Sequence, residues 1–96
     1  MSTPTLRCET SGVVFALTGE VTTVGRGEGV DVDLEDPSVS RLHAELVRRG
    51  CHLYVTDLGL STNGTRVNGM RVTEEVEVRP GDHLSLGAVR WRLGGR

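Results

Sequence analysis

Turn-forming residues interrupt this sequence every few positions, which leaves room for short extended segments and little room for helix. Clusters such as Gly25-Arg26-Gly27, Asp36-Pro37-Ser38 and Pro80-Gly81-Asp82 predict turns, because Gly accepts unusual backbone angles and Asp and Ser bond to nearby backbone. Residues 21–24 are β-branched throughout, which favours a strand. A chain of this kind buries its apolar side chains best by packing sheets together.

Two further patterns support strands. Val89, Trp91 and Leu93 alternate with Arg90 and Arg92, so one face is expected in a core and the other in water. Arg66-Val67 and the segment 70–72 flank Asn68-Gly69, a pair that favours a two-residue type I′ turn because both positions need a positive φ. Both patterns predict short strands, the second as a hairpin.

One segment is ambiguous. Leu42, Leu46 and Val47 in the segment Ser40–Arg48 have helical spacing, but apolar and polar residues also alternate there. Arg49-Gly50 and an apolar-alternating run over residues 51–56 follow. We expect a strand hairpin over these residues. With it, the chain has about ten short strands, which predicts an all-β sandwich or barrel.

Length and composition limit the remaining options. The 96 residues predict a single domain over residues 1–96, with a core from about residue 5 to residue 93 and short frayed tails. The net charge of −2 argues against a nucleic-acid partner. All 11 basic residues are Arg, which reflects either codon usage or a phosphate ligand, and composition does not separate the two.

Cys8 and Cys51 fall in different predicted strands without metal-ligand spacing, so we expect reduced, partly buried thiols, with no metal and no cofactor. No apolar run approaches membrane-spanning length, and the first residues lack a signal-peptide pattern. These observations predict a cytoplasmic protein without a membrane partner, and we expect it to act as a monomer.

The residues that could carry chemistry fall in three predicted loops. The first holds Arg26, the second holds Ser40, Arg41 and His43, and the third is the polar run Ser61–Thr65. If these loops cluster at one end of a sandwich, they bring together two guanidinium groups, several hydroxyls and a side-chain amide. That set of donors suits a dianionic phosphate.

The same residues resemble the forkhead-associated (FHA) domain family, and the resemblance extends from about Val21 to Leu93. It rests on segments in matching order and spacing: Gly25-Arg26, Ser40-Arg41-Leu42-His43, Ser61-Thr62-Asn63-Gly64-Thr65, Val67-Asn68-Gly69 and Arg79-Pro80-Gly81-Asp82. The resemblance implies an FHA-like β-sandwich of two twisted, mainly antiparallel sheets with 10–11 short strands. It also implies binding loops at one end and recognition of a phosphothreonine-containing protein in Ser/Thr kinase signalling.

The resemblance also implies roles for individual residues. Arg26, Ser40 and Arg41 would contact the phosphate, Thr62 would support the phosphothreonine, and Asn63 would hold the peptide main chain. Ser38 lies where the family reads the peptide residue three positions past the phosphothreonine. The loops would be supported by Gly25, His43, Gly64 and Asn68, the last through its turn.

One departure from the family pattern lies in the third loop. The family has two residues between Asp and Ser before the Asn-Gly-Thr segment, whereas three residues separate Asp57 from Ser61 here. The extra residue affects the placing of Thr62, and Leu60 could add an apolar contact to a partner. An alternative function is therefore a phosphate-independent interaction scaffold of the same fold.

An enzymatic function has little support. Ser61, His43 and Asp57 can be grouped as a triad, but any small protein yields such a set. The Gly25-x-Gly27-x-Gly29 segment lacks both the spacing and the following helix of a nucleotide-binding loop. We therefore expect a protein that is not an enzyme.

Overall fold

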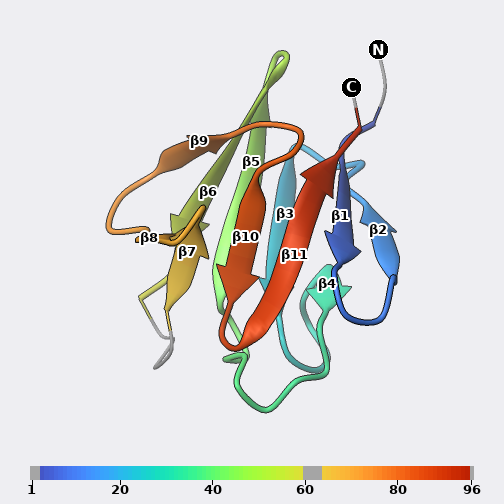
Figure 1. Cartoon of the computed structure of the whole chain (residues 1–96), viewed down its shortest axis with the longest axis vertical. Helices are drawn as coiled ribbons and strands as arrows, with labels where there is room; N and C mark the ends of the chain where they lie inside the picture. The colour runs from blue at the N-terminus through green and yellow to red at the C-terminus, as the bar shows by residue number, and fades with distance from the viewer. Residues whose placement is uncertain (1–2, 60–63, 96) are drawn as a thin grey trace.

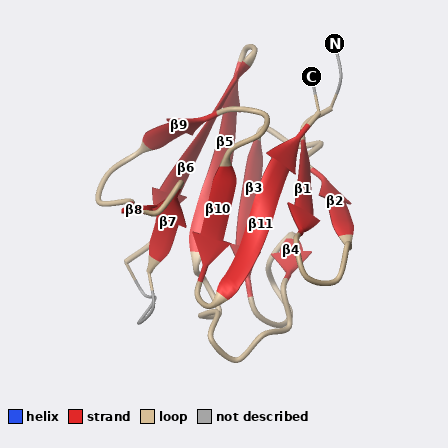
Figure 2. Ribbon diagram, in the orientation of Figure 1, coloured by secondary structure: helices blue, strands red, loops and turns tan. Residues whose placement is uncertain are grey.

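The computed structural model describes residues 3–59 and 64–95, and it folds them into two packed β-sheets without helices (Figures 1 and 2). One sheet has the strand order β2-β1-β11-β10-β7-β8 and the other has the order β4-β3-β5-β6-β9. The first contains β1 (Thr5–Cys8), β2 (Val14–Ala16), β7 (Thr65–Val67), β8 (Met70–Arg71), β10 (His83–Leu86) and β11 (Val89–Gly94). The second contains β3 (Val21–Gly25), β4 (Val32–Asp33), β5 (Ala44–Arg49), β6 (His52–Asp57) and β9 (Val76–Val78).

This arrangement confirms the predicted all-β sandwich and replaces the barrel alternative. Neighbouring strands are antiparallel except β3 and β4, which pair in parallel through Val24↔Val32 and Gly25↔Asp33. The parallel pair is possible because the connection after β3 returns the chain, so that β4 runs in the same direction as β3. The prediction of mainly antiparallel sheets is therefore confirmed.

The core lies between the two sheets and follows the alternation of the sequence. Trp91 and Leu93 in β11 are buried, while Arg90 and Arg92 between and beside them are exposed. The ring of Phe15 packs against that of Trp91, with ring centroids 5.9 Å apart. The opposite sheet contributes fully buried side chains such as Leu46 and Val55 to the same cluster. Burial of each such side chain contributes about 1.5–3 kcal/mol.

The ambiguous segment is a strand. Residues 44–49 form β5, which pairs with β3 on one edge and with β6 on the other. Ala44 and Leu46 point into the core, while Glu45 and Val47 are only partly buried on the other face. Central placement in the sheet satisfies the backbone N–H and C=O groups on both edges, so the strand prevails over the helical spacing of Leu42, Leu46 and Val47.

The predicted two-residue turn joins β7 to β8. Asn68 has φ +50° and Gly69 has φ +86°, and Val67 pairs with Met70 across the turn. The Asn68 side chain accepts a hydrogen bond from the His83 N–H at 2.9 Å and donates one to Asp82 Oδ1 at 3.2 Å. Asn68 therefore both forms the turn and ties it to the start of β10.

The cysteines differ in part from the expectation. Cys8 and Cys51 are both thiols, but Cys51 is exposed in the turn between β5 and β6 rather than in a strand. The turn forms there because Gly50 has φ +65°, a conformation that ends the extended backbone. Among the described residues, nothing forms a helix with the length and apolar character needed to cross a membrane.

The described parts of the three loops singled out by the sequence lie at one end of the sandwich. The connections β3–β4 and β4–β5 lie together at the lower end in Figure 1, beside the turn between β10 and β11, and the start of β7, which follows the third loop, points to the same end. Both chain ends and the β5–β6 turn lie at the upper end. The sheet topology thus divides the molecule into a loop end and a terminal end.

Candidate functional site

The first and second loops are joined by backbone contacts at Gly25. A Cβ atom on Gly25 would lie 1.9 Å from the carbonyl oxygen of Arg41, so only glycine fits at the end of β3. The next N–H, that of Arg26, donates to the carbonyl oxygens of Ser40 at 3.1 Å and Arg41 at 3.3 Å. Gly25 therefore allows the backbone of residues 40–41 to lie directly beside Arg26.

Within the described residues, the Arg26 side chain makes one hydrogen bond, and the residue is exposed. Its Nε donates to the Val39 carbonyl at 2.9 Å. A guanidinium group has five N–H donors, so one fixed bond sets its orientation and leaves the terminal nitrogens for a ligand. This geometry suits bidentate binding of a phosphate.

His43 joins the second loop to the third. It is fully buried, and its Nδ1 accepts a hydrogen bond from the Ser40 N–H at 3.2 Å. The proton of the neutral ring therefore sits on Nε2, which lies 2.8 Å from the Gly64 carbonyl and donates to it. The backbone of His43 also bonds to Val24 O in β3 and to the N–H of Leu58, the residue after β6. His43 thus lies beneath the site rather than in it.

The described part of the third loop is held from both sides. Asp57 Oδ1 accepts a hydrogen bond from the Gly59 N–H at 2.7 Å, which forms a tight turn at the end of β6. Gly64 has φ +77°, and its carbonyl also accepts the Gly87 N–H at 3.2 Å. The predicted contacts Thr62 and Asn63, and the insertion that includes Leu60, lie outside the described residues.

Ser38 has a clear place in the loop end. Its hydroxyl donates to Asp36 Oδ1 and accepts the Ala88 N–H at 2.8 Å, which ties the second loop to the turn between β10 and β11. Gly87 in that turn has no room for a Cβ, which would lie 2.4 Å from the Ser38 carbonyl oxygen. The specificity contact expected of Ser38 stays a prediction. The structure shows that Ser38 also anchors the second loop to the β10–β11 turn.

Two carboxylates shape the loops from within. Hydrogen bonds from the hydroxyl and N–H of Ser38 hold the pKa of Asp36 below its ordinary value. Asp33 Oδ1 accepts the N–H groups of Gly27 at 2.9 Å and Glu35 at 3.0 Å, which fixes the path of the chain on either side of β4. Sequence reasoning did not assign these roles, although Asp36-Pro37-Ser38 carried a turn signal.

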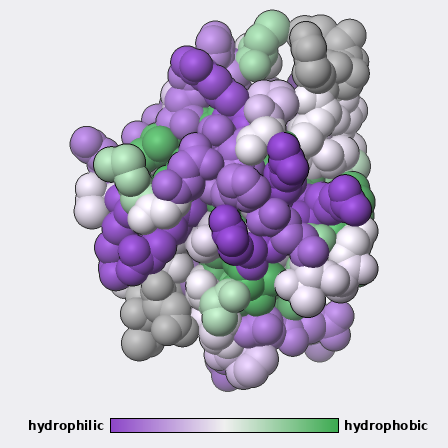
Figure 3. Space-filling view, viewed as in Figure 1, coloured by the Kyte–Doolittle hydropathy of each residue, from purple (hydrophilic) through white to green (hydrophobic). Residues whose placement is uncertain are grey.

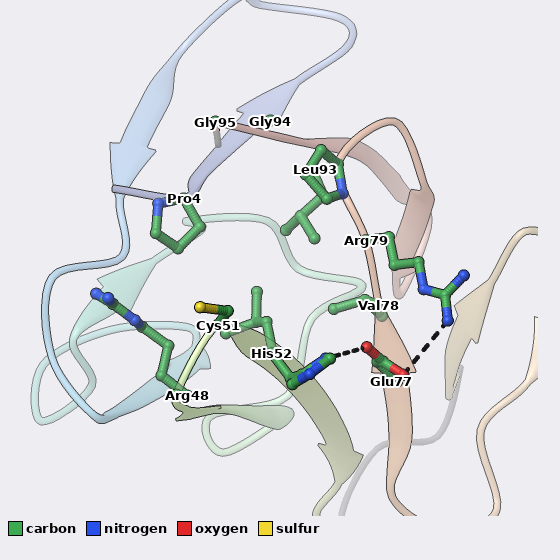
Figure 4. A pocket seen from close by; sticks show the side chains of 13 residues that line it. Pro4, Arg48, Cys51, His52, Glu77, Val78, Arg79, Leu93, Gly94 and Gly95 are labelled. Atoms are coloured by element: carbon green, nitrogen blue, oxygen red, sulfur yellow. Dashed lines mark hydrogen bonds and ion pairs between the residues drawn. The ribbon is translucent and has the colours of Figure 1, made fainter. Parts of the chain in front are cut away.

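A shallow hollow of about 330 Å³ lies beside Arg26 and is lined also by Gly27, Asp33, Glu35 and Pro37. A second cavity, of about 490 Å³, lies at the terminal end (Figure 4). Figure 4 shows its floor near Cys51 and His52, with the latter bonded to Glu77 at 2.7 Å. The lining of the larger cavity includes none of the residues predicted for the site or its support. Within residues 3–59 and 64–95, no group of His, Cys, Asp and Glu could hold a metal ion.

Of the ten residues predicted for the site and its support, eight lie in the described structure. Gly25, Arg26, Ser40 and Arg41 are brought into direct backbone contact, and His43 links them to Gly64. Ser38 borders this group. Asn68 lies apart from it in the β7–β8 turn and bonds to the start of β10, so its expected support of the loops stays a prediction. The loop end therefore presents one arginine from each of two connections, and hydrogen bonds hold the backbones of these connections together.

Comparison with known proteins gives consistent matches. The FHA domain model matches residues 22–87. The oxoglutarate dehydrogenase inhibitor of Corynebacterium jeikeium is 40% identical over 80 residues, which cover 83% of this chain and 54% of that protein. The chain thus spans about half the length of this curated relative.

Solved structures are similar over nearly the whole chain. An FHA domain studied for its phosphothreonine-dependent interactions matches with a TM-score of 0.87 and 33% identity, covering 96% of this chain and 95% of that one. EmbR of Mycobacterium tuberculosis, solved in complex with a low-affinity phosphopeptide, matches with a TM-score of 0.89 and 29% identity. That match covers 96% of this chain and 24% of the EmbR chain.

Proposed function

Because the chain belongs to the FHA domain family, we propose that it recognises phosphothreonine in a phosphorylated protein partner of a Ser/Thr kinase pathway. In this role, residues 1–96 act as a single domain that meets its partner in the cytoplasm. The similar structures support the proposal, since one is an FHA domain with phosphothreonine-dependent interactions and another is bound to a phosphopeptide.

The observation that carries the proposal is the way in which Arg26 is held. One bond from its Nε to Val39 orients the guanidinium group, while the backbone of Ser40 and Arg41 lies against the Arg26 N–H. Arg26, Ser40 and Arg41 then bind the phosphate. Each bond between a charged group and the phosphate contributes roughly 1.5–3 kcal/mol. A few such bonds suffice for a micromolar complex, which needs about 8 kcal/mol after ordering costs.

The remaining roles follow the family. Thr62 supports the phosphothreonine, Asn63 holds the peptide main chain, and Ser38 borders the place of a residue beyond the phosphothreonine. Both ring nitrogens of buried His43 are engaged in hydrogen bonds, so its role is to position the loops and not to move protons. We accordingly propose a binding module without catalytic activity.

The test compares binding of one peptide in its phosphothreonine and unmodified forms by calorimetry. We expect binding of the phosphorylated form alone, and Arg26→Ala to weaken it by about 2–5 kcal/mol, since the phosphate loses its partner. Arg79→Ala is the matched control, because Arg79 is an exposed arginine at the other end of the molecule; it should change the affinity by less than about twofold.

Equal binding of both peptide forms by the wild type contradicts the proposal. Affinity that survives both Arg26→Ala and removal of the phosphate instead identifies the phosphate-independent scaffold.

A further inference from the structure

The outer face of the six-stranded sheet is strongly basic. Its six strands hold no Asp or Glu, but they hold five exposed arginines. We call this surface the arginine face; its residues are Arg7, Arg66, Arg71, Arg90 and Arg92. Hydrophilic residues cover much of this sheet in Figure 3. The strands of the other sheet differ, with four carboxylates and two arginines: Asp33, Glu45, Asp57, Glu77, Arg48 and Arg49.

The strand register places like charges directly opposite one another. Arg7 pairs with Arg92 between β1 and β11, and Arg66 pairs with Arg71 between β7 and β8. Like charges at directly opposite positions destabilise a sheet. These arginine pairs therefore lower the stability of the isolated protein. An anionic partner that neutralises the arginines would explain why they are present.

Little within the chain neutralises them. Glu9 lies at the edge of the face, where it accepts a hydrogen bond from His83 at 2.9 Å and lies 3.7 Å from Arg90 Nε. In the part of the chain that the structure describes, Arg7, Arg66 and Arg71 have no ion-pair partner. The face therefore keeps most of its positive charge although the whole chain has a net charge of −2.

The arginine face begins at the proposed binding site. A Cβ on Gly64 would lie 3.0 Å from the Cζ atom of Arg71, so the Arg71 guanidinium rests directly against the third loop. From there, one row crosses the sheet through Arg66 on β7 and Ser85 on β10 to Arg90 on β11. Three interstrand steps span about 14 Å. An extended peptide covers that distance with about four residues.

We propose that the row from Arg71 to Arg90 binds an acidic segment of the phosphorylated partner, next to its phosphothreonine. This inference rests on the proposed function of the loop end and adds a sequence preference to it. A basic surface favours an anionic partner. Because the arginine face adjoins the third loop, the partner that can reach it is the phosphoprotein bound there.

A nucleic acid fits the same surface less well. Proteins that bind single strands combine a basic groove with aromatic residues on which bases stack. The three aromatic residues of this chain lie elsewhere: Trp91 is buried, Phe15 packs on it, and Tyr54 belongs to the other sheet. An acidic peptide needs only the guanidinium groups.

The test measures binding of three phosphothreonine peptides of equal length: one with neutral flanks, one with about four glutamates before the phosphothreonine, and one with about four after it. We expect one of the two acidic peptides to bind about tenfold more tightly than the neutral peptide in low salt, as two or three exposed ion pairs allow. The gain should shrink towards 1 M salt, where the Debye length is about 3 Å.

The diagnostic variant carries Arg66→Gln and Arg90→Gln. It leaves Arg71 in place because Arg71 contacts the third loop. We expect this variant to bind the neutral phosphopeptide like the wild type and to lose most of the gain from the glutamates. Arg79→Gln removes a similar exposed charge away from the face and should keep that gain. Thermal unfolding of the variants confirms that they are folded.

Three results overturn the inference: no gain with either acidic peptide, a gain that survives Arg66→Gln with Arg90→Gln, or an equal loss with Arg79→Gln. Tighter binding of an oligonucleotide than of the acidic phosphopeptide also overturns it and assigns the face to nucleic acid. If none of the three peptides binds better than its unphosphorylated form, the proposed function fails as well. A loss of the acidic preference alone leaves that function intact.

Discussion

Replacing Gly25 by Ala should lower the stability of this protein and disturb its proposed binding site. The added Cβ would lie 1.9 Å from the Arg41 carbonyl oxygen and 3.0 Å from that of Ser40. Because both contacts are with backbone carbonyl oxygens, no side chain can rotate away to relieve them. The end of β3 and residues 40–41 must separate until the shortest contact exceeds 3.0 Å.

The cost follows from the groups that move. Forced insertion of a methyl group into a packed site costs roughly 1–3 kcal/mol. The separation also weakens the bonds from the Arg26 N–H to Ser40 and Arg41, and one such hydrogen bond contributes about 1 kcal/mol. We therefore expect Gly25→Ala to be about 2–4 kcal/mol less stable than a comparable Gly→Ala variant. For a domain of this size, that difference lowers the Tm by roughly 10–25 °C.

Gly19→Ala is the matched control. Gly19 lies in the turn between β2 and β3, and a Cβ there would make only an ordinary contact, 3.4 Å from the Val21 carbonyl oxygen. Both substitutions restrict the unfolded chain by the same amount, worth about 0.4–1 kcal/mol, so this effect cancels in the comparison. Urea denaturation of the two variants gives the difference directly. If they unfold within about 0.5 kcal/mol of each other, the reasoning from close backbone contact is wrong.

Three further outcomes are expected. Asn68→Ala should be about 1–2 kcal/mol less stable than Asn68→Gly by thermal unfolding, because both lose the bonds to residues 82–83 but only Ala is strained at φ +50°; equal stability would contradict this. His43→Ala leaves Ser40 N–H and Gly64 O without a common partner, so it should cost about 2–4 kcal/mol in urea denaturation and weaken phosphopeptide binding; unchanged binding would show that the loops keep their places without it. Ser38 holds the pKa of Asp36 below its ordinary value, so the unfolded state binds a proton there more readily than the folded state. The ionised Asp36 therefore stabilises the fold above about pH 4, and this contribution is lost as the pH falls further. Asp36→Asn should therefore flatten the acid limb of the stability curve, and an unchanged limb would exclude this carboxylate as a contributor.

The strands could be predicted where the conformation depends only on neighbouring residues. The turn at Asn68-Gly69 depends on two positive φ angles that few other residue pairs accept, so the sequence alone specifies it. The alternation in β11 likewise predicts that Trp91 is buried and that Arg90 is exposed, since strand side chains point to opposite faces in turn. By contrast, the segment Ser40–Arg48 fits two local structures, and its neighbours β3 and β6 decide between them.

The site shows the same division. Its residue types are visible in the sequence because a phosphate needs charged and polar donors, and the family resemblance places them in order. How they are held is not visible there. The bond from Arg26 to Val39, the contact of Ser38 with Ala88 and the burial of His43 all join segments that are distant along the chain.

The sequence by itself determined the alternation, the turns and which residues are candidates for a phosphate site, because each depends on the chemistry of neighbouring residues. Only the tertiary structure decided which loops share one end, why Gly25 has to be glycine, and that five arginines form one face. These properties depend on strand register and sheet order, which bring together residues from distant parts of the chain. Arg66, Arg71 and Arg90 are scattered solvated charges in the sequence, and they become one row only when β8, β7, β10 and β11 pair.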